Sequence, residues 1–164
     1  MARRHQKWAS GDVFLIPLED EGKRFAVGQV VAPEPKALNS VGIVLGKHDV
    51  GTPEEALALT LDESELILMK LTTRESLDRW LWRIIGQKPL AFPIEIYPWH
   101  GATTFVGARI YGSGSVKVFA RAFFGYGPWD AYLDPEFFDK LLIHPALKPT
   151  SLKYKKDFPT DDRA

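Results

Sequence analysis

The sequence of 164 residues contains no cysteine, only four histidines and no long hydrophobic run. A chain without cysteine forms no disulfide, binds no metal through thiolates and has no cysteine nucleophile. A membrane-spanning helix requires about 18 consecutive apolar residues, and the sequence has no such run. Buried side chains alone must therefore stabilise the fold, and a reducing compartment suits it.

An excess of charge of one sign is also missing, because Lys and Arg together number 21 and so do Asp and Glu. Broad capture of nucleic acid needs a basic surface that displaces counterions, so the neutral balance argues against a nucleic-acid partner. Hydrophobic residues make up 45% of the chain, which is too much for a disordered protein. We expect one domain over residues 11–147, with a loose arm before it (1–10) and a poorly ordered, charged tail after it (148–164).

The first residues superficially resemble a signal peptide. Basic residues at positions 3, 4 and 7 precede the apolar stretch Val13–Leu18. That stretch is only six residues long, contains Pro17, and is followed by three acidic residues instead of a small-residue cleavage site. We therefore expect no signal peptide, no membrane partner and a cytoplasmic location.

Residues 11–31 predict a β-hairpin. Apolar side chains occupy both faces of its first strand, so this strand should be covered on both sides. Pro17 cannot donate to a strand ladder and indicates an edge or a bulge. Gly28 lies in the middle of the return strand and indicates a bulge or a close approach of the backbone. These features favour a strongly bent sheet or a small barrel.

The middle of the sequence predicts further strands and a first helix. Thr52 can cap a helix that covers residues 53–59, because Pro53 suits its first position and Glu55 completes a capping box. Residues 72–85 fit either a helical turn followed by a strand or one helix from residue 74. Bulky and β-branched residues at their end favour the turn and strand. The other predicted strands are residues 41–45 and 65–71.

The C-terminal half predicts a second hairpin and a second helix. The hairpin joins residues 104–111 to residues 116–123 around a Gly-Ser turn. The helix begins at Asp134-Pro135 and has an apolar face of Phe and Leu. Because no regular β-α-β alternation appears, we expect a β-rich α+β fold: a strongly bent antiparallel sheet or small barrel with two short flanking helices.

The sequence predicts no catalytic or metal site. The histidines lie far apart without a ligand motif, and they are His5, His48, His100 and His144. A nucleophile elbow and a phosphate-binding loop are also missing. Carboxylates gather near the first hairpin turn, where a solvated turn is favoured over catalysis, and they are Asp12, Glu19, Asp20 and Glu21. We expect a protein that is not an enzyme and binds no cofactor.

Two loops that combine large aromatics with Pro or Gly are candidate contact sites. Tyr and Trp in loops often anchor protein interfaces, and they can also stack on nucleobases. The candidate residues are Tyr97, Trp99, His100, Tyr126, Trp129 and Asp130. In the competing interpretation, which we favour, both tryptophans cap the hydrophobic core. A basic set on the second predicted hairpin (Arg109, Lys117 and Arg121) forms either a patch or an ordinary solvated sheet face, and the neutral charge favours the latter.

Two blocks of the sequence resemble the immunity protein 26 family. The first block is residues 11–18 (GDVFLIPL), a polar turn and residues 25–30 (FAVGQV). The second block is Leu71-Thr72-Thr73 with residues 82–86 (WRIIG) and Pro89. The resemblance covers roughly residues 10–92. It implies a bacterial immunity protein, encoded beside a polymorphic toxin, that neutralises the toxin by direct protein–protein binding and has no catalytic residues.

On this hypothesis the partner is a cognate protein toxin, and the acidic pair Asp20 and Glu21 could contact a basic nuclease surface. The oligomeric state stays open. The alternative is a PemK-like barrel endoribonuclease or an RNA-binding module, because the Gly-Asp-Val opening is also similar to PemK-like toxins. Those toxins continue with an Arg-rich, Pro-containing strand. This sequence has residues 24–28 (RFAVG) there, so we favour the immunity protein.

Overall fold

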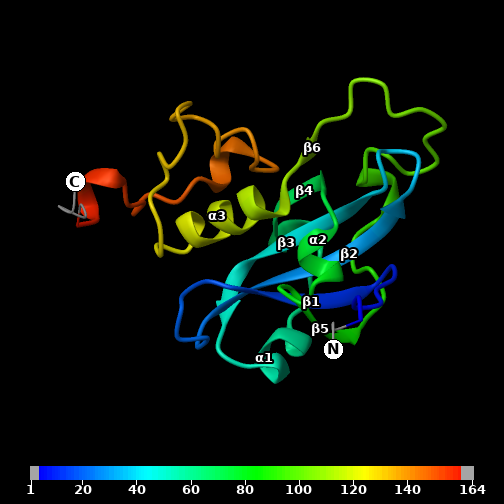
Figure 1. Ribbon diagram of the computed structural model, residues 1–164, viewed down its shortest axis with the longest axis horizontal. Helices are drawn as coiled ribbons and strands as arrows, with labels where there is room; N and C mark the ends of the chain where they lie inside the picture. The colour runs from blue at the N-terminus through cyan, green and yellow to red at the C-terminus, as the bar shows by residue number, and fades with distance from the viewer. Residues whose placement is uncertain (1–3, 160–164) are drawn as a thin grey trace.

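The computed structural model describes residues 4–159, and a six-stranded sheet runs through their centre (Figure 1). The strand order is β5-β1-β2-β3-β4-β6, with all neighbours antiparallel except β6, which is parallel to β4. The strands are β1 (Asp12–Pro17), β2 (Phe25–Glu34), β3 (Ser40–Val50), β4 (Leu66–Thr72), β5 (Arg83–Gln87) and β6 (Ile110–Tyr111). The helices are α1 (Pro53–Ala58), α2 (Glu75–Asp78) and α3 (Ser113–Phe123), with 3-10 turns at Glu63–Glu65, Ile94–Ile96, Pro145–Leu147 and Lys155–Asp157.

The first hairpin forms as predicted, and both of its faces are buried. One face of the sheet packs against α3 and the C-terminal aromatic residues, through side chains such as Phe14 and Ile16. The opposite face packs against α1 and the segment before residue 99, through side chains such as Val13 and Leu15. The helices α3 and α1 therefore lie on opposite sides of the sheet (Figure 1).

Bulges bend the sheet at the residues that the sequence marked. The β2–β3 register shifts between Ala26 and Gly28, and a Cβ atom on Gly28 would overlap the Phe14 ring. Pro17 lies beyond the part of β1 that pairs with β5, where its missing N–H removes no ladder bond. In the described chain β5 and β6 stay at opposite edges. The bent α+β sheet is confirmed, whereas the barrel alternative is wrong.

The elements from residue 40 to residue 87 follow the prediction. Thr52 caps α1 by accepting a hydrogen bond from the backbone N–H of Glu55 at 3.1 Å. The ambiguous segment 72–85 forms the single helical turn α2 followed by β5. The third predicted strand is longer than its apolar run, because β3 continues to Val50.

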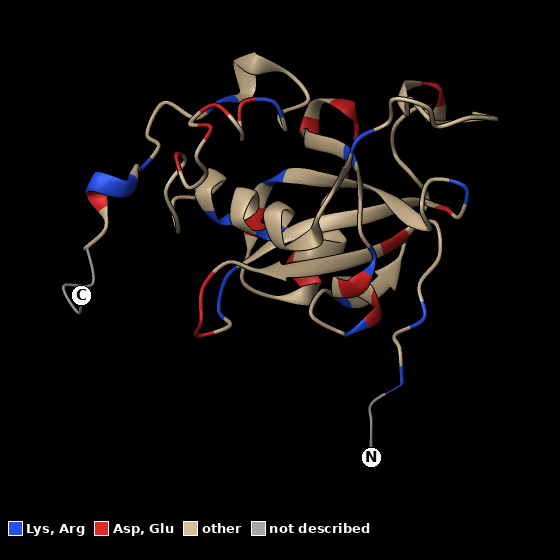
Figure 2. Ribbon diagram, turned by 45° about the horizontal axis from the view of Figure 1, so that its top comes forward, with Lys and Arg blue, Asp and Glu red and all other residues tan. Residues whose placement is uncertain are grey.

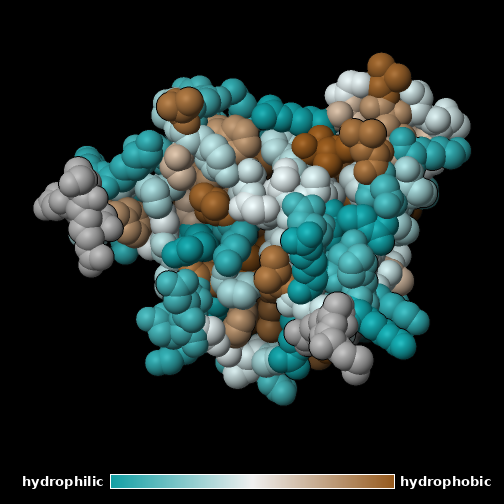
Figure 3. All heavy atoms as spheres, viewed as in Figure 1, coloured by the Kyte–Doolittle hydropathy of each residue, from teal (hydrophilic) through white to brown (hydrophobic). Residues whose placement is uncertain are grey.

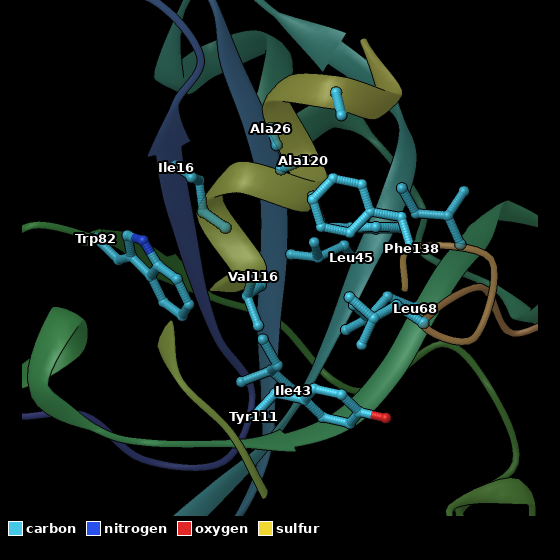
Figure 4. Packing of buried hydrophobic residues seen from close by; sticks show 14 of the residues in the cluster. Ile16, Ala26, Ile43, Leu45, Leu68, Trp82, Tyr111, Val116, Ala120 and Phe138 are labelled. Carbon is cyan, nitrogen blue, oxygen red and sulfur yellow. The ribbon is translucent and has the colours of Figure 1, made fainter. Parts of the chain in front are cut away.

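The second predicted hairpin is wrong, because residues 113–123 form the helix α3. Apolar residues at 116, 119, 120 and 123 recur at helical spacing, and this spacing outweighs the alternation that a strand requires. Val116 and Ala120 point from α3 toward the strands (Figure 4). The residue before the helix, Gly112, is its N-cap and not part of a hairpin turn.

The second predicted helix is also wrong, because residues 134–144 form a series of turns. The side chain of Asp134 accepts from the backbone N–H of Glu136 at 2.9 Å, as a cap would, yet no helix continues from it. The backbone N–H of Ile143 instead donates to the carbonyl of Ile67 at 2.8 Å, which draws this segment along the edge of β4. Phe138 remains buried among the aromatic residues that cover the sheet.

Both ends of the described chain contact the domain. Gln6 is buried, and its side chain bonds three backbone groups of the α2–β5 region. Near the other end, the backbone N–H of Trp129 donates to the carbonyl of Lys153 at 2.8 Å. The predictions for residues 1–3 and 160–164 lie outside the described residues. Within residues 4–159, every helix is too short or too polar to cross a membrane.

Candidate protein-binding surface

The two aromatic loops lie on opposite faces of the sheet. Tyr97 and Trp99 pack on the α1 side, whereas Tyr126 and Trp129 pack on the α3 side. Trp129 is only 2% exposed, and its Nε1 donates to Asp139 at 2.8 Å. Trp129 therefore caps the core, and the two loops do not meet in one surface.

Tyr97 is a structural residue as well. It is buried, and its hydroxyl donates to Glu34 Oε1 at 3.1 Å. Burial, followed by the nearby Glu34 carboxylate, raises the pKa of Tyr97, and burial likewise raises the pKa of Glu34. Trp99 is half-buried with its ring edge-on to Tyr97, at 5.4 Å between centroids. His100, the next residue, is exposed.

The acidic turn between β1 and β2 is held together by Glu19. The Glu19 carboxylate accepts hydrogen bonds from the backbone N–H groups of Lys23 and Arg24. Hydrogen bonding with the Glu21 side chain, and then with the Arg24 backbone, lowers the pKa of Glu19 to about 2. Asp20 and Glu21 stay exposed in the turn, and the acidic stretch is followed by a basic one at Lys23 and Arg24 (Figure 2).

The remaining predicted residues are dispersed. Asp130 accepts from the backbone N–H of Lys155 at 2.7 Å, so it ties the C-terminal segment to the loop. Lys117 is exposed on α3, and Arg121, one turn later, points a guanidinium nitrogen at the Tyr126 carbonyl. Arg109 lies apart from both, just before β6. Because α3 is a helix, these three cations do not share a sheet face.

An exposed apolar patch lies at the opposite end of the sheet from the acidic turn. Leu38, in the β2–β3 turn, is 90% exposed, and Val106, in the loop before β6, is 94% exposed. Figure 3 shows hydrophobic side chains gathered at this corner of the molecule. Large exposed apolar side chains that lie together in one patch are typical of a contact site for a partner.

Leu38 and Val106 line the same hollow, which has a volume of about 430 Å³. A second hollow of about 440 Å³ continues past Leu38 and Ile110 toward α2. We call this continuous depression the apolar groove, and its defining residues are Leu38, Phe105, Val106, Ala108 and Ile110.

The backbone holds Leu38 in an unfavourable conformation. Its φ is 53°, in the left-handed region that side chains other than Gly, Asn and Asp rarely occupy. The next residue, Asn39, has φ 55° and is fixed by a hydrogen bond from Arg74 to its side chain at 2.9 Å. A strained and exposed leucine in a tight turn is typical of a contact site, where strain is tolerated for function.

A third hollow of about 320 Å³ adjoins the apolar groove beside β6. We call it the cationic hollow, because Lys70 and Arg109 line it together with Trp99, Phe105 and Tyr111. Burial, followed by repulsion from Arg109, lowers the pKa of Lys70. Trp99 is the one predicted contact residue that lines this end of the sheet.

The apolar groove is not predictable from the sequence. The predicted strand over residues 104–111 gives no indication that Val106 is exposed, and no sequence pattern singles out Leu38. The available signal was a large apolar residue in each loop, followed by Asn39 in one loop and by Gly107 in the other. That signal is weak, because isolated exposed hydrophobics are common on protein surfaces.

The described residues offer little for catalysis. Among residues 4–159, no three His, Asp or Glu side chains gather as metal ligands. His48 is exposed and pairs with Glu65 at 3.2 Å, as a surface ion pair would. A small, partly open hollow beside α1 measures about 70 Å³, which is room for about two water molecules.

Comparison with known proteins places the chain in a family. A search of curated proteins and a search of solved structures each gave no match. A family model described as Immunity protein 26 matches residues 9–98, which is more than half of the chain and confirms the resemblance. The matched region carries β1 to β5 and Leu38, whereas the loop with Val106 and the helix α3 follow it. The protein belongs to the Immunity protein 26 family.

Proposed function

We propose that this protein neutralises a cognate polymorphic toxin by binding it directly, in the cytoplasm of the bacterial cell that carries the toxin gene. Family membership supports an immunity role. The protein itself supplies no chemistry in this proposal. It covers the surface that the toxin needs for its own activity, which an interface of about 1,600 Å² is large enough to do.

The observation that carries the proposal is the pair of exposed apolar side chains across the apolar groove. Leu38 and Val106 come from segments about 70 residues apart in the sequence and line one hollow. Phe105 and Ile110 extend the same surface with partly exposed apolar area. A contiguous apolar surface with a rim of charged residues is typical of a protein-binding site.

The contact residues predicted from the sequence lie outside the centre of the proposed interface. Asp20 and Glu21 lie at the other end of the sheet, where they could speed association with a basic toxin by electrostatic steering. Trp99 lines the cationic hollow and would belong to the rim of the interface, with the exposed residue His100 next to it in the chain. Tyr97 and Trp129, which are buried, would act only by supporting the fold.

Expression in a bacterial host tests the proposal. Expressed alone, the protein should leave growth unchanged, and expressed with the toxin domain encoded beside its own gene, it should restore growth. Growth arrest or RNA cleavage by the protein alone would contradict the proposal and favour the PemK-like endoribonuclease alternative. Failure to protect against the neighbouring toxin, with both proteins present in soluble form, would contradict it as well.

A further inference from the structure

Two cations in the cationic hollow share one aromatic ring. Lys70 Nζ lies 5.9 Å from the centroid of the Tyr111 ring, and the Arg109 guanidinium lies 4.8 Å from the same centroid. Arg109 also lies 5.5 Å from the ring of Phe137. The aromatic faces therefore fix both positive charges beside the hollow, although the charges repel each other.

Within residues 4–159, neither cation has a carboxylate partner. Other cations of the domain do: Arg24 pairs with Asp49 at 3.0 Å, and Lys140 pairs with Asp134 at 2.7 Å. Asp134 is near enough to feel the charge of Arg109, but its ion pair is with Lys140. Two neighbouring cations thus face a hollow without a counter-charge from the described chain.

The position of Lys70 makes this arrangement costly for the isolated protein. Lys70 lies on β4 between the buried residues Met69 and Leu71 and is itself half-buried. Water solvates its ammonium group only in part, and the charge of Arg109 repels it. An anion bound in the hollow would offset both penalties.

The contacts of Arg109 leave its hydrogen-bonding edge available. The rings of Tyr111 and Phe137 interact with the guanidinium through its charge, and the described residues accept no hydrogen bond from it. The planar fork of N–H donors matches two carboxylate oxygens. The guanidinium is therefore held in position for an acceptor that comes from outside the domain.

We propose that the cationic hollow receives a carboxylate of the toxin, paired with Arg109 and Lys70, while the apolar groove covers the toxin's adjoining apolar surface. This inference rests on the proposed function. A protein ligand fits better than a nucleic acid, because the hollow is continuous with an apolar surface and the chain has no net charge to attract a polyanion.

Calorimetric titration of the toxin domain encoded beside this gene tests the inference. The variants are Arg109→Glu, Lys70→Glu and Lys70→Met, with Lys117→Glu as the control, because Lys117 is an exposed cation away from the hollow. We expect each Arg109 and Lys70 variant to weaken binding about tenfold or more, and the control to bind like the unchanged protein. Lys70→Met should keep the Tm of the unchanged protein, which separates lost binding from lost folding.

A reciprocal experiment identifies the carboxylate. Asp and Glu residues on the toxin surface are changed one at a time to Lys, and one of these changes should restore binding to Arg109→Glu. If both Glu variants bind the toxin like the unchanged protein while Leu38→Asp fails to bind, this inference is wrong and the proposed function stands. If the unchanged protein does not bind the toxin, both are wrong. If the Glu variants instead lose binding to single-stranded RNA and keep the toxin, the hollow is a nucleic-acid site and the inference is wrong.

Discussion

At the scale of the residue, Leu38 lowers the stability of the isolated protein at the place where we propose that the toxin binds. Its left-handed backbone conformation and its exposed side chain both cost free energy in the isolated protein. A residue chosen for folding alone at this position would be Gly or Asn, as Asn39 is at the next position. Contact with the toxin, as proposed above, would offset both costs of a leucine at this position.

Replacement of Leu38 by glycine should therefore stabilise the protein while weakening toxin binding. Relief of the backbone strain is worth about 1–2 kcal/mol, and the added freedom of the unfolded chain offsets about 0.4–1 kcal/mol of it. We expect a net gain of about 1 kcal/mol in the free energy of unfolding, measured by urea denaturation. Asn39→Gly is the control and should gain less, because Asn tolerates this conformation and accepts a bond from Arg74. A loss of stability in Leu38→Gly would contradict this view of the turn.

At the scale of the element, local sequence signals predicted the first half of the fold better than the second. Pro17 and Gly28 marked the bends of the hairpin, and Thr52 marked the start of α1, because each acts on its own backbone. The prediction of a hairpin turn at residues 112–115 was wrong, because glycine and serine suit both a hairpin turn and the start of a helix. The sheet has an apolar face that a helix must cover, and this tertiary contact selects the helix over the hairpin. The helix α3 buries Phe119 against that face.

The candidate site was less predictable than the fold. Exposure of Leu38 and Val106 depends on how two distant segments come together, and no local pattern encodes it. The pair of neighbouring cations, Lys70 and Arg109, likewise forms only when β6 pairs with β4 and brings the two residues together. The sequence indicated the aromatic loops as candidate contact sites. Tyr97 and Trp129 are buried, because side chains of this size are usually needed in the core of a small domain.

The segment before β1 should contribute to stability through one side chain. Gln6 Nε2 donates to the carbonyls of Leu77 and Trp82 at 2.9 and 2.8 Å, and Gln6 Oε1 accepts from the N–H of Ile84 at 3.0 Å. Gln6→Ala leaves these buried backbone groups without partners, so we expect it to lower the free energy of unfolding by about 2–4 kcal/mol. Lys7→Ala, at an exposed neighbour, should change it by less than about 0.5 kcal/mol. Equal effects of the two changes would show that the segment does not anchor to α2 and β5.

At the scale of the whole molecule, the two ends of the sheet differ in character. One end carries the acidic turn with Asp20 and Glu21, and the other carries the apolar groove and the cationic hollow. Both faces of the sheet are covered by other parts of the chain, whereas its two ends carry exposed side chains. The strained turn and the unpaired cations both lie at the second end, so the central claim is that the toxin binds there.

Calorimetric titration of the neighbouring toxin domain with Leu38→Asp and Leu133→Asp tests this claim most directly. Leu133 is a fully exposed leucine in the segment after α3 and lines neither the groove nor the hollow, so it is the matched control. We expect Leu38→Asp to weaken binding by about 30-fold or more, as loss of a central contact does, and Leu133→Asp to bind like the unchanged protein. Unchanged affinity in Leu38→Asp, or an equal loss in both variants, would contradict the account.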